Sequence, residues 1–225
     1  ARSWLGTADT AAVLGAIGIA CATAEECSVA NAGEVAERIG FPLVAKAIVP
    51  GLIHKSDVGG GILGLADGAA VRLAAPLLEE RMAARGHRLR GILLQRQVAD
   101  GVEASVGLRT DPVFGPLVIL GLGGSLVELV GDVAVRLPPL TDVGANEMID
   151  RLRTRPLLAG YRGGPPADRE ALVSILLRVS ALALAVPEIR EIELNPVKLL
   201  RPGEGAVVLD ARIRLATAEE LPEPP

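Results

Sequence analysis

The chain has 225 residues, half of them hydrophobic and 2% aromatic, with a net charge of −4. This length suffices for one large domain or two small ones, with a core built from Ala, Val, Leu and Ile. The net negative charge, without basic stretches that carry interleaved aromatics, argues against nucleic-acid binding, and the longest uncharged apolar run, residues 115–127, is shorter than the ~18–20 residues of a membrane span. We therefore expect no membrane association. Cys21 and Cys27 do not form a zinc-site pattern, and a domain of this size does not need a disulfide, so we expect a reducing, cytoplasmic setting.

Helix and strand signals alternate along the first part of the chain. We predict a short helix over 11–17 with Thr7, Asp9 or Thr10 as its cap, and a buried strand over 17–23. Ser28 is the predicted cap of a helix that runs through Ile39 and that Gly40 ends. Strands over 42–48 and 62–65 follow, and Asp67 then caps a helix over 69–84.

The second part contains more strands. We predict strands over 91–98 and 102–108, joined as a hairpin at Asp100-Gly101, then strands over 117–120 and 132–137. Thr141 caps a helix to about Arg153, a longer helix covers 167–186, and strands over 189–194 and 206–210 flank Asn195-Pro196. Strands that occur both as hairpins and in alternation with helices predict an α+β (mixed α/β) fold rather than a doubly wound sheet.

The stretch FPLVAKAIVPGLIHKSDVGGGILGL, residues 41–65, carries an unusual concentration of chemistry. Lys46 and Lys55 are two of only three lysines, against twenty arginines, and His54 lies between them. Lysine is a compact point charge suited to phosphate, and Gly59, Gly60 and Gly61 let backbone N–H groups approach an anion. Neither a Walker A nor a dinucleotide fingerprint is present, so we expect a glycine-rich hairpin over phosphates. The alternative is an exposed turn with an incidental histidine.

A second cluster lies near the C-terminus. Glu193 and Asn195 share one face of a predicted strand because side chains alternate, and Asp210 ends the next strand. A hairpin would bring Asp210 beside Asn195. Mg²⁺ is commonly held by one or two protein oxygens together with water and phosphates, so we expect these two residues to be metal ligands, the alternative being ordinary polar residues at a strand end.

Together these segments resemble the ATP-grasp domain of NDP-forming acyl-CoA synthetases, most closely the β subunit or β-like domain of ADP-forming acetyl-CoA synthetase. The resemblance rests on residues 41–61, on GVEASVGLRTDPVFGPLVILGLGG at 101–124, and on EIELNPV at 191–197 with LDAR at 209–212. It runs in the same order from about Thr10 to Leu215. It implies an ATP-grasp fold of two subdomains with the nucleotide site between them. Residues 1–94 would form the smaller subdomain, 95–217 the larger one, and 218–225 a tail or linker.

The resemblance also implies roles for individual residues. Lys46 would contact the nucleotide phosphates beneath Gly59 to Gly61, with Lys55 neutralising phosphoryl charge; Gln95 to Val98 would form the adenine hinge and Glu103 would meet the ribose. Asn195 and Asp210 match Mg²⁺ ligands, and Arg109 is a phosphate contact. His54 matches a transiently phosphorylated histidine that relays a phosphoryl group. Gly61 stands where the family more often has valine.

The implied activity is that of an acid–CoA ligase (ADP-forming), with ATP/ADP and Mg²⁺ as cofactors. Nothing in the chain resembles the CoA-binding module, so the expected partner is a CoA-binding/ligase domain or α subunit, in cis or in trans, which would handle acyl-CoA and phosphate. The alternative is a non-catalytic, nucleotide-sensing module of a protein lysine acetyltransferase.

Overall fold

The computed structural model describes residues 3–50, 60–98, 100–122, 131–217 and 220. Contacts divide the chain into two units, which we call the small unit (22–99) and the large unit (1–21 with 100–225). Residues 1–21, which the sequence division grouped with the smaller subdomain, belong by their contacts to the large unit. The reason is that strand β1 (Ser3–Trp4) pairs antiparallel with β11 (Ala211–Leu215).

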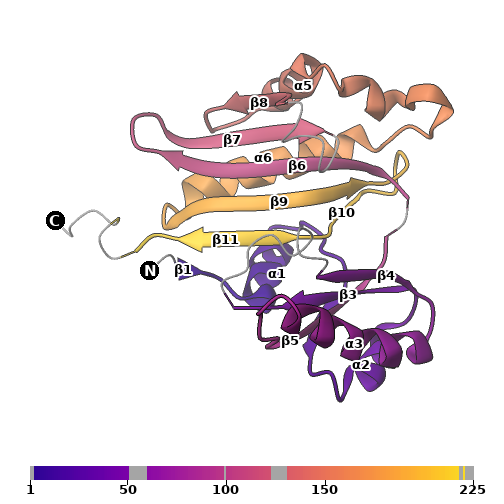
Figure 1. Ribbon diagram of the computed structural model, residues 1–225. Coiled ribbons are helices and arrows are strands. Elements are labelled where there is room, and N and C mark those ends of the chain that lie inside the picture. Colours follow the sequence, from indigo (N-terminus) through magenta and orange to yellow (C-terminus); the bar gives the residue numbers. More distant parts are fainter. Residues whose placement is uncertain (1–2, 51–59, 99, 123–130, 218–219, 221–225) are drawn as a thin grey trace. The chain divides into compact units, whose positions relative to one another are not determined.

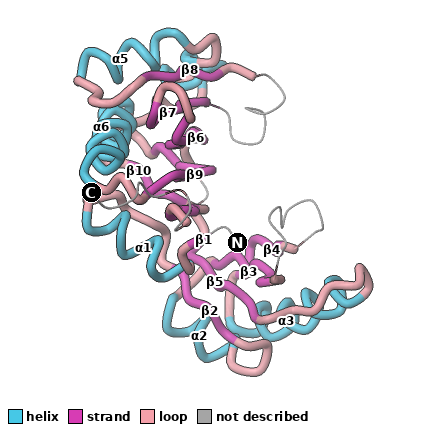
Figure 2. The backbone as a smooth tube through the Cα atoms, turned by 90° about the vertical axis from the view of Figure 1, so that its left-hand side faces the viewer, coloured by secondary structure: helices cyan, strands magenta, loops and turns pink. Residues whose placement is uncertain are grey.

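The small unit is an antiparallel sheet with two helices on one face (Figures 1 and 2). Its strand order is β2-β5-β3-β4, for β2 (Ala24–Cys27), β3 (Leu43–Ile48), β4 (Gly61–Leu65) and β5 (Gly91–Arg96). Helices α2 (Ala32–Ile39) and α3 (Gly68–Ala83) pack on it. Leu43, Ala45, Ile92 and Leu94 point into the shared core and are fully buried, so the alternate residues of β3 and β5 lie on the other face.

Local signals explain the helix boundaries of the small unit. Gly40 ends α2 with a φ of 84°, which glycine adopts without strain. The Asp67 side chain caps α3 by accepting a hydrogen bond from Ala70 N at 2.7 Å. At the start of α2 the cap position belongs to Asn31, and Ser28 supports it by donating its Oγ hydrogen to Asn31 Oδ1 at 2.7 Å.

The large unit has a longer, mostly antiparallel sheet with helices on one face (Figures 1 and 2). The strand order is β1-β11-β9-β6-β7-β8, with β10 also pairing with β9. The further strands are β6 (Val102–Asp111), β7 (Gly115–Leu122), β8 (Val133–Arg136), β9 (Ile189–Leu199) and β10 (Ala206–Val208). The helices are α1 (Thr7–Ala16), α5 (Asp142–Arg151) and α6 (Arg169–Ala185), with short 3₁₀ helices η1 (Arg155–Ala159) and η2 (Tyr161–Gly163).

The core of the large unit lies between its sheet and its helices. Val106, Leu120, Ile192 and Leu194 of the sheet are buried against Leu176 and other residues of α6 and α5. Among the residues that the structure describes, no helix of this unit packs on the opposite side of the sheet, which we call the open face. Alternation places Glu103 and Arg109 of β6, and Glu191, Glu193 and Lys198 of β9, there. The mixed α/β class predicted from the sequence is confirmed.

Besides the cap of α2, which is Asn31 rather than Ser28, three local predictions were wrong. Residues 17–23 form no strand; Cys21 makes a single parallel bridge to Val208. Helix α1 begins at Thr7 behind Gly6, without a side-chain cap. Asp100-Gly101 does not join a hairpin, because β5 and β6 belong to different sheets.

Gly101 has another role. Its φ is 120°, and a Cβ there would lie 2.6 Å from the Leu199 carbonyl oxygen, so only glycine lets β6 begin this close to β9.

In the described ranges, no helix has the length and apolar character needed to cross a bilayer.

Candidate functional site

The predicted lysine-bearing hairpin is confirmed where it is described. β3 and β4 pair antiparallel with Lys46 opposite Gly61, and Ala47 N donates to the Gly60 carbonyl at 2.7 Å. Lys46 is half-buried between two fully buried alanines, Ala45 and Ala47. It therefore lies on the face of the small sheet that points away from α2 and α3.

The glycine at position 61 is not demanded by packing. A Cβ built there would meet only the Ala45 carbonyl oxygen, at the ordinary contact distance of 3.9 Å. A Cβ at this position would therefore make no close contact with the described residues. The predicted site residues His54, Lys55 and Gly59 lie outside the described residues.

The predicted adenine hinge, Gln95 to Val98, begins in β5, an inner strand of the small sheet. Gln95 is buried, with 6% of its surface exposed, and pairs with Ala24 and Val44 on the two neighbouring strands. Since Val44 and Lys46 alternate with the core residues of β3, Gln95 and Lys46 share the helix-free face of this sheet. Val98 is half-buried and is the last described residue of the small unit.

In the large unit, Asn195 and Asp210 meet at an irregularity of the sheet. Two residues of β9, Asn195 and Pro196, lie opposite the single β6 residue Ser105, which makes a bulge. On the other side of β9 the strand is interrupted between β10 and β11, and Asp210 lies in the interruption. Asn195 N donates to the Asp210 carbonyl at 3.0 Å. The adjacency predicted for these two residues is therefore present, through backbone contact.

This pair suits a hard cation. One carboxylate and one amide oxygen are the donor types that Mg²⁺ takes, with water and phosphate completing its shell. Among the described residues, no group of three or more His, Cys, Asp or Glu side chains could hold a metal by itself. Asn195 and Asp210 therefore suit a metal ion that is also coordinated by nucleotide phosphates. They suit less well a structural metal ion that is coordinated by protein side chains alone.

Glu103 and Arg109 lie on β6 and point to the open face. Each is directly opposite a charged residue of β9: Glu103 faces Lys198, and Arg109 faces Glu191. Lys198 Nζ lies 3.2 Å from Glu103 Oε1. The sequence offered one signal for Lys198, since it is the third lysine of an arginine-rich chain, but its partner could not be read from the sequence.

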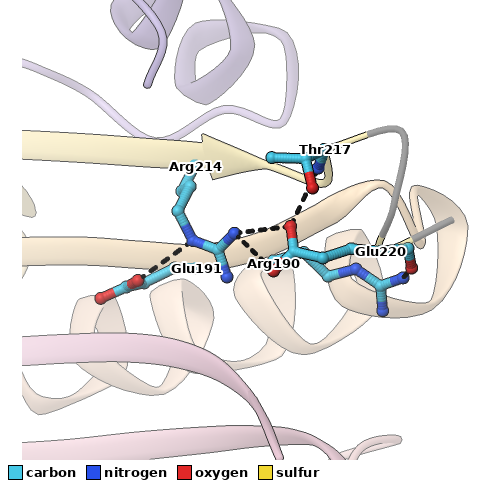
Figure 3. A network of polar contacts seen from close by, with 5 residues as sticks. All are labelled: Arg190, Glu191, Arg214, Thr217 and Glu220. Atoms are coloured by element: carbon cyan, nitrogen blue, oxygen red, sulfur yellow. Dashed lines mark hydrogen bonds and ion pairs between the residues drawn. The ribbon is translucent and has the colours of Figure 1, made fainter. Parts of the chain in front are cut away.

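A clasp that the sequence did not reveal surrounds Arg214 at one end of β9 and β11 (Figure 3). Arg214 Nε lies 3.4 Å from Glu191 Oε2, and Arg214 Nη1 lies 2.9 Å from Glu220 Oε2. Glu220 also accepts from Thr217 N, and its main-chain carbonyl accepts from Arg190. The Thr217 N–H, with Arg214 close by, lowers the pKa of the Glu220 carboxyl. These contacts bind the end of the described chain to the sheet.

A buried carboxylate fixes the turn that follows β9. Asp168 is 6% exposed, caps α6 by accepting from Ala171 N at 2.9 Å, and accepts from Gly203 N at 2.8 Å and Gly205 N at 2.9 Å. The Ala171 N–H, with those of the two glycines, holds the pKa of Asp168 below its ordinary value despite burial. The clamp ties the β9–β10 turn to α6 and so supports the strand that carries Asn195.

Comparison with known proteins shows which family has this sequence and fold. The family model of the ATP-grasp domain matches residues 1–215. The β subunit of acetate–CoA ligase [ADP-forming] I from Pyrococcus furiosus is 40% identical over 195 residues, covering 85% of this chain and 81% of that subunit. Acetate–CoA ligase [ADP-forming] I from Archaeoglobus fulgidus is 40% identical over 183 residues, covering 80% of this chain. The chain spans only 26% of that longer relative.

Solved structures agree. Two complexes of the dinucleotide-forming acetyl-coenzyme A synthetase 1 from Ca. Korarchaeum cryptofilum, each 36% identical, match with TM-scores of 0.88 and 0.82. They cover 95% of this chain, and the matches span 94% and 93% of those chains. The first complex holds coenzyme A and Ca-AMPCP; the second holds coenzyme A and Mg-AMPPCP, with a phosphohistidine segment pointing towards the nucleotide-binding site. The chain therefore belongs to the ATP-grasp domain family, has its fold, and is similar to the β subunits of ADP-forming acetate–CoA ligases.

Proposed function

We propose that the chain is the nucleotide-binding part of an ADP-forming acyl-CoA synthetase. It would move a phosphoryl group between a phosphohistidine and Mg-ADP during the reaction acyl-CoA + ADP + phosphate = acid + CoA + ATP. The observation that carries this proposal is the meeting of Asn195 and Asp210 at the β9 bulge. Their donor types suit Mg²⁺, and they occur in a chain 40% identical to an ADP-forming ligase subunit.

The small unit would supply phosphate and adenine contacts. Lys46 offers a point charge to the phosphates, and the backbone N–H groups of Gly59 to Gly61 would approach the same oxygens. Gln95 to Val98 would line the adenine. The position of Lys46 and Gln95 on one face of the same sheet supports a common ligand for both residues.

The large unit would supply ribose, phosphate and metal contacts. Glu103 accepts hydrogen bonds from the ribose hydroxyls, Arg109 contacts phosphate, and Asn195 and Asp210 hold the cation. When bound, Mg²⁺ neutralises the charge that phosphoryl transfer concentrates on the phosphate oxygens. All four residues lie on β6 or β9, or beside them, in the large unit.

His54 would carry the phosphoryl group. A neutral imidazole is nucleophilic near pH 7. Its ring nitrogen forms the bond to phosphorus while the bond to the donor, a phosphohistidine of the partner, breaks; the group then passes to the terminal oxygen of ADP. Lys55 neutralises charge in the transfer.

A CoA-binding partner, as a domain or an α subunit, would complete the reaction in the cytoplasm. The subunit name of the Pyrococcus relative and the coenzyme A in the Korarchaeum complexes support this partner, and the free thiols of Cys21 and Cys27 suit a reducing compartment. The relatives reported above are ligases, which favours catalysis over a sensing module in an acetyltransferase.

Nucleotide binding tests the proposal. Calorimetry should detect one site for Mg-ADP, and nucleotide at 100 times Kd should stabilise the fold by about 2.7 kcal/mol, visible as a higher Tm. Lys46→Ala should weaken binding, whereas Arg38→Ala should not, since that variant removes one positive charge from an exposed ion pair with Glu25 in the same unit. Absence of both heat and a Tm change at millimolar Mg-ADP would refute the proposal.

A further inference from the structure

The Glu103–Lys198 ion pair is built on a lysine. Arginines supply the positive charge of other ion pairs in the described chain, among them those of Arg38, Arg90 and Arg214. The chain has three lysines against twenty arginines, so a lysine at this position departs from its general usage. Glu103 is also the residue proposed above to bind ribose. The question is what a lysine does there that an arginine would not do.

The geometry fixes the carboxylate from one side. Glu103 and Lys198 are directly opposite each other on β6 and β9, and Nζ lies 3.2 Å from Oε1. The lysine side chain is 14% exposed and the glutamate side chain 36%. Lys198 is therefore largely buried, whereas the Glu103 carboxylate is still accessible to a ligand. Val102 and Ala104, on either side of Glu103, pair with Leu199 and Val197, which fixes the register of the pair.

The chemistry of lysine leaves part of the carboxylate to another donor. An ammonium group is a point charge, whereas a guanidinium matches both carboxylate oxygens with its planar fork. A carboxylate offers about four acceptor positions. Contact at Oε1 therefore orients Glu103 and leaves Oε2 for further hydrogen bonds. A ribose presents two adjacent hydroxyl donors, which suit an oriented carboxylate that is engaged on one side only.

We propose that Lys198 is a positioning residue, which holds the Glu103 carboxylate in the orientation that accepts the ribose hydroxyls of the bound nucleotide. The inference rests on the proposed function and deepens it, because it assigns recognition of the sugar to a pair of residues. Lys198 itself need not touch the nucleotide. It acts by keeping Glu103 at the open face, on the same strand, β9, that carries Asn195.

The test measures the binding of ADP and of 2′,3′-dideoxy-ADP to the 225-residue chain in the presence of Mg²⁺. The measured quantity is the ratio of the Kd for dideoxy-ADP to the Kd for ADP. Because the ribose hydroxyls donate hydrogen bonds to a charged group, this ratio should be at least about ten for the wild-type chain. Glu103→Gln should reduce this ratio, and Lys198→Met should reduce it to within about threefold of one. Arg214→Met is the matched control: it also removes one positive charge from a cross-strand pair of the large unit, and it should leave the ratio unchanged.

The ratio separates positioning from general electrostatics, because loss of a positive charge weakens both nucleotides alike. Lys198→Arg keeps the charge and should also lower the ratio, since the fork engages both oxygens; it decides the question if Lys198→Met does not fold. A wild-type ratio near one, or a wild-type ratio retained in folded Lys198 variants that bind Mg-ADP, overturns the inference. Failure of the proposed function looks different: neither nucleotide binds the wild-type chain.

Discussion

Replacing Asp168 by asparagine should destabilise the large unit strongly. The carboxylate accepts from three backbone N–H groups, those of Ala171, Gly203 and Gly205, and it is 6% exposed. Each hydrogen bond to a charged acceptor contributes about 1.5–3 kcal/mol. Asparagine keeps one oxygen and turns an N–H₂ group towards a backbone donor. Because the three bonds share one side chain and do not add, we expect a loss of about 2–4 kcal/mol.

The single tryptophan makes this measurable in the large unit by itself. Trp4 lies in β1 and pairs with β11, so its fluorescence during urea unfolding reports on that sheet. A loss of 3 kcal/mol corresponds to a fall in Tm of about 6–12 °C for a unit of this size. Asp111→Asn is the matched control: Asp111 also accepts from two backbone N–H groups, those of Val113 and Phe114, but in an exposed turn, so we expect a much smaller change.

The pH dependence follows from the pKa of Asp168, which is lowered by the Ala171 N–H and those of the two glycines. A lowered folded-state pKa means that the stabilisation is complete above the unfolded-state value, about 3.9, and is lost as the pH falls through the folded-state value. The difference between wild type and Asp168→Asn should therefore be largest at neutral pH and shrink below about pH 4. A difference under about 1 kcal/mol at pH 7, or one that grows in acid, would refute the reasoning.

Two further predictions concern the metal pair and the start of β6. Asp210→Asn and Asn195→Ala should each weaken the dependence of nucleotide affinity on Mg²⁺ without loss of the fold; unchanged Mg²⁺ titrations by calorimetry in both variants would remove these residues from the proposed metal site. Gly101→Ala should destabilise the large unit by about 2–3 kcal/mol in Trp4-monitored unfolding, because its φ is 120° and its Cβ would lie 2.6 Å from the Leu199 carbonyl oxygen. Gly115→Ala, with a φ of 77° and nothing within 4 Å of its Cβ, should cost only the backbone strain of about 1 kcal/mol, and an equal loss in the two variants would contradict the close-contact explanation.

The features predicted well from the sequence are those that neighbouring residues determine. Gly40 ends a helix and Asp67 and Thr141 cap helices because each acts on groups within a few residues. The β3–β4 hairpin follows from apolar runs of strand length on either side of a glycine-rich segment. In each of these cases the residues that decide the structure lie within one short window of the chain.

Non-local features were missed or misread. Asp100-Gly101 has the composition of a hairpin turn, but the glycine is needed for an approach to Leu199, far away in the sequence. The apolar run 17–23 has strand composition, yet only Cys21 finds a bridge partner, Val208. The β9 bulge that presents Asn195 depends on the registers of β6 and β11 together. The pairing of Lys198 with Glu103 likewise depends on strand register, which composition and spacing do not specify.

The most direct test of the proposed phosphoryl transfer is the label on His54. The chain, together with the proposed CoA-binding partner, is given labelled ATP and Mg²⁺, and the phosphorylated protein is treated with acid and with alkali. We predict a label on His54 that acid removes and alkali does not, as expected for phosphoryl bound to an imidazole nitrogen. His54→Ala should lose this label and nearly all acyl-CoA synthesis, with nucleotide affinity changed by less than about tenfold. Near-normal turnover of the His54→Ala variant in the complete assembly would contradict the relay.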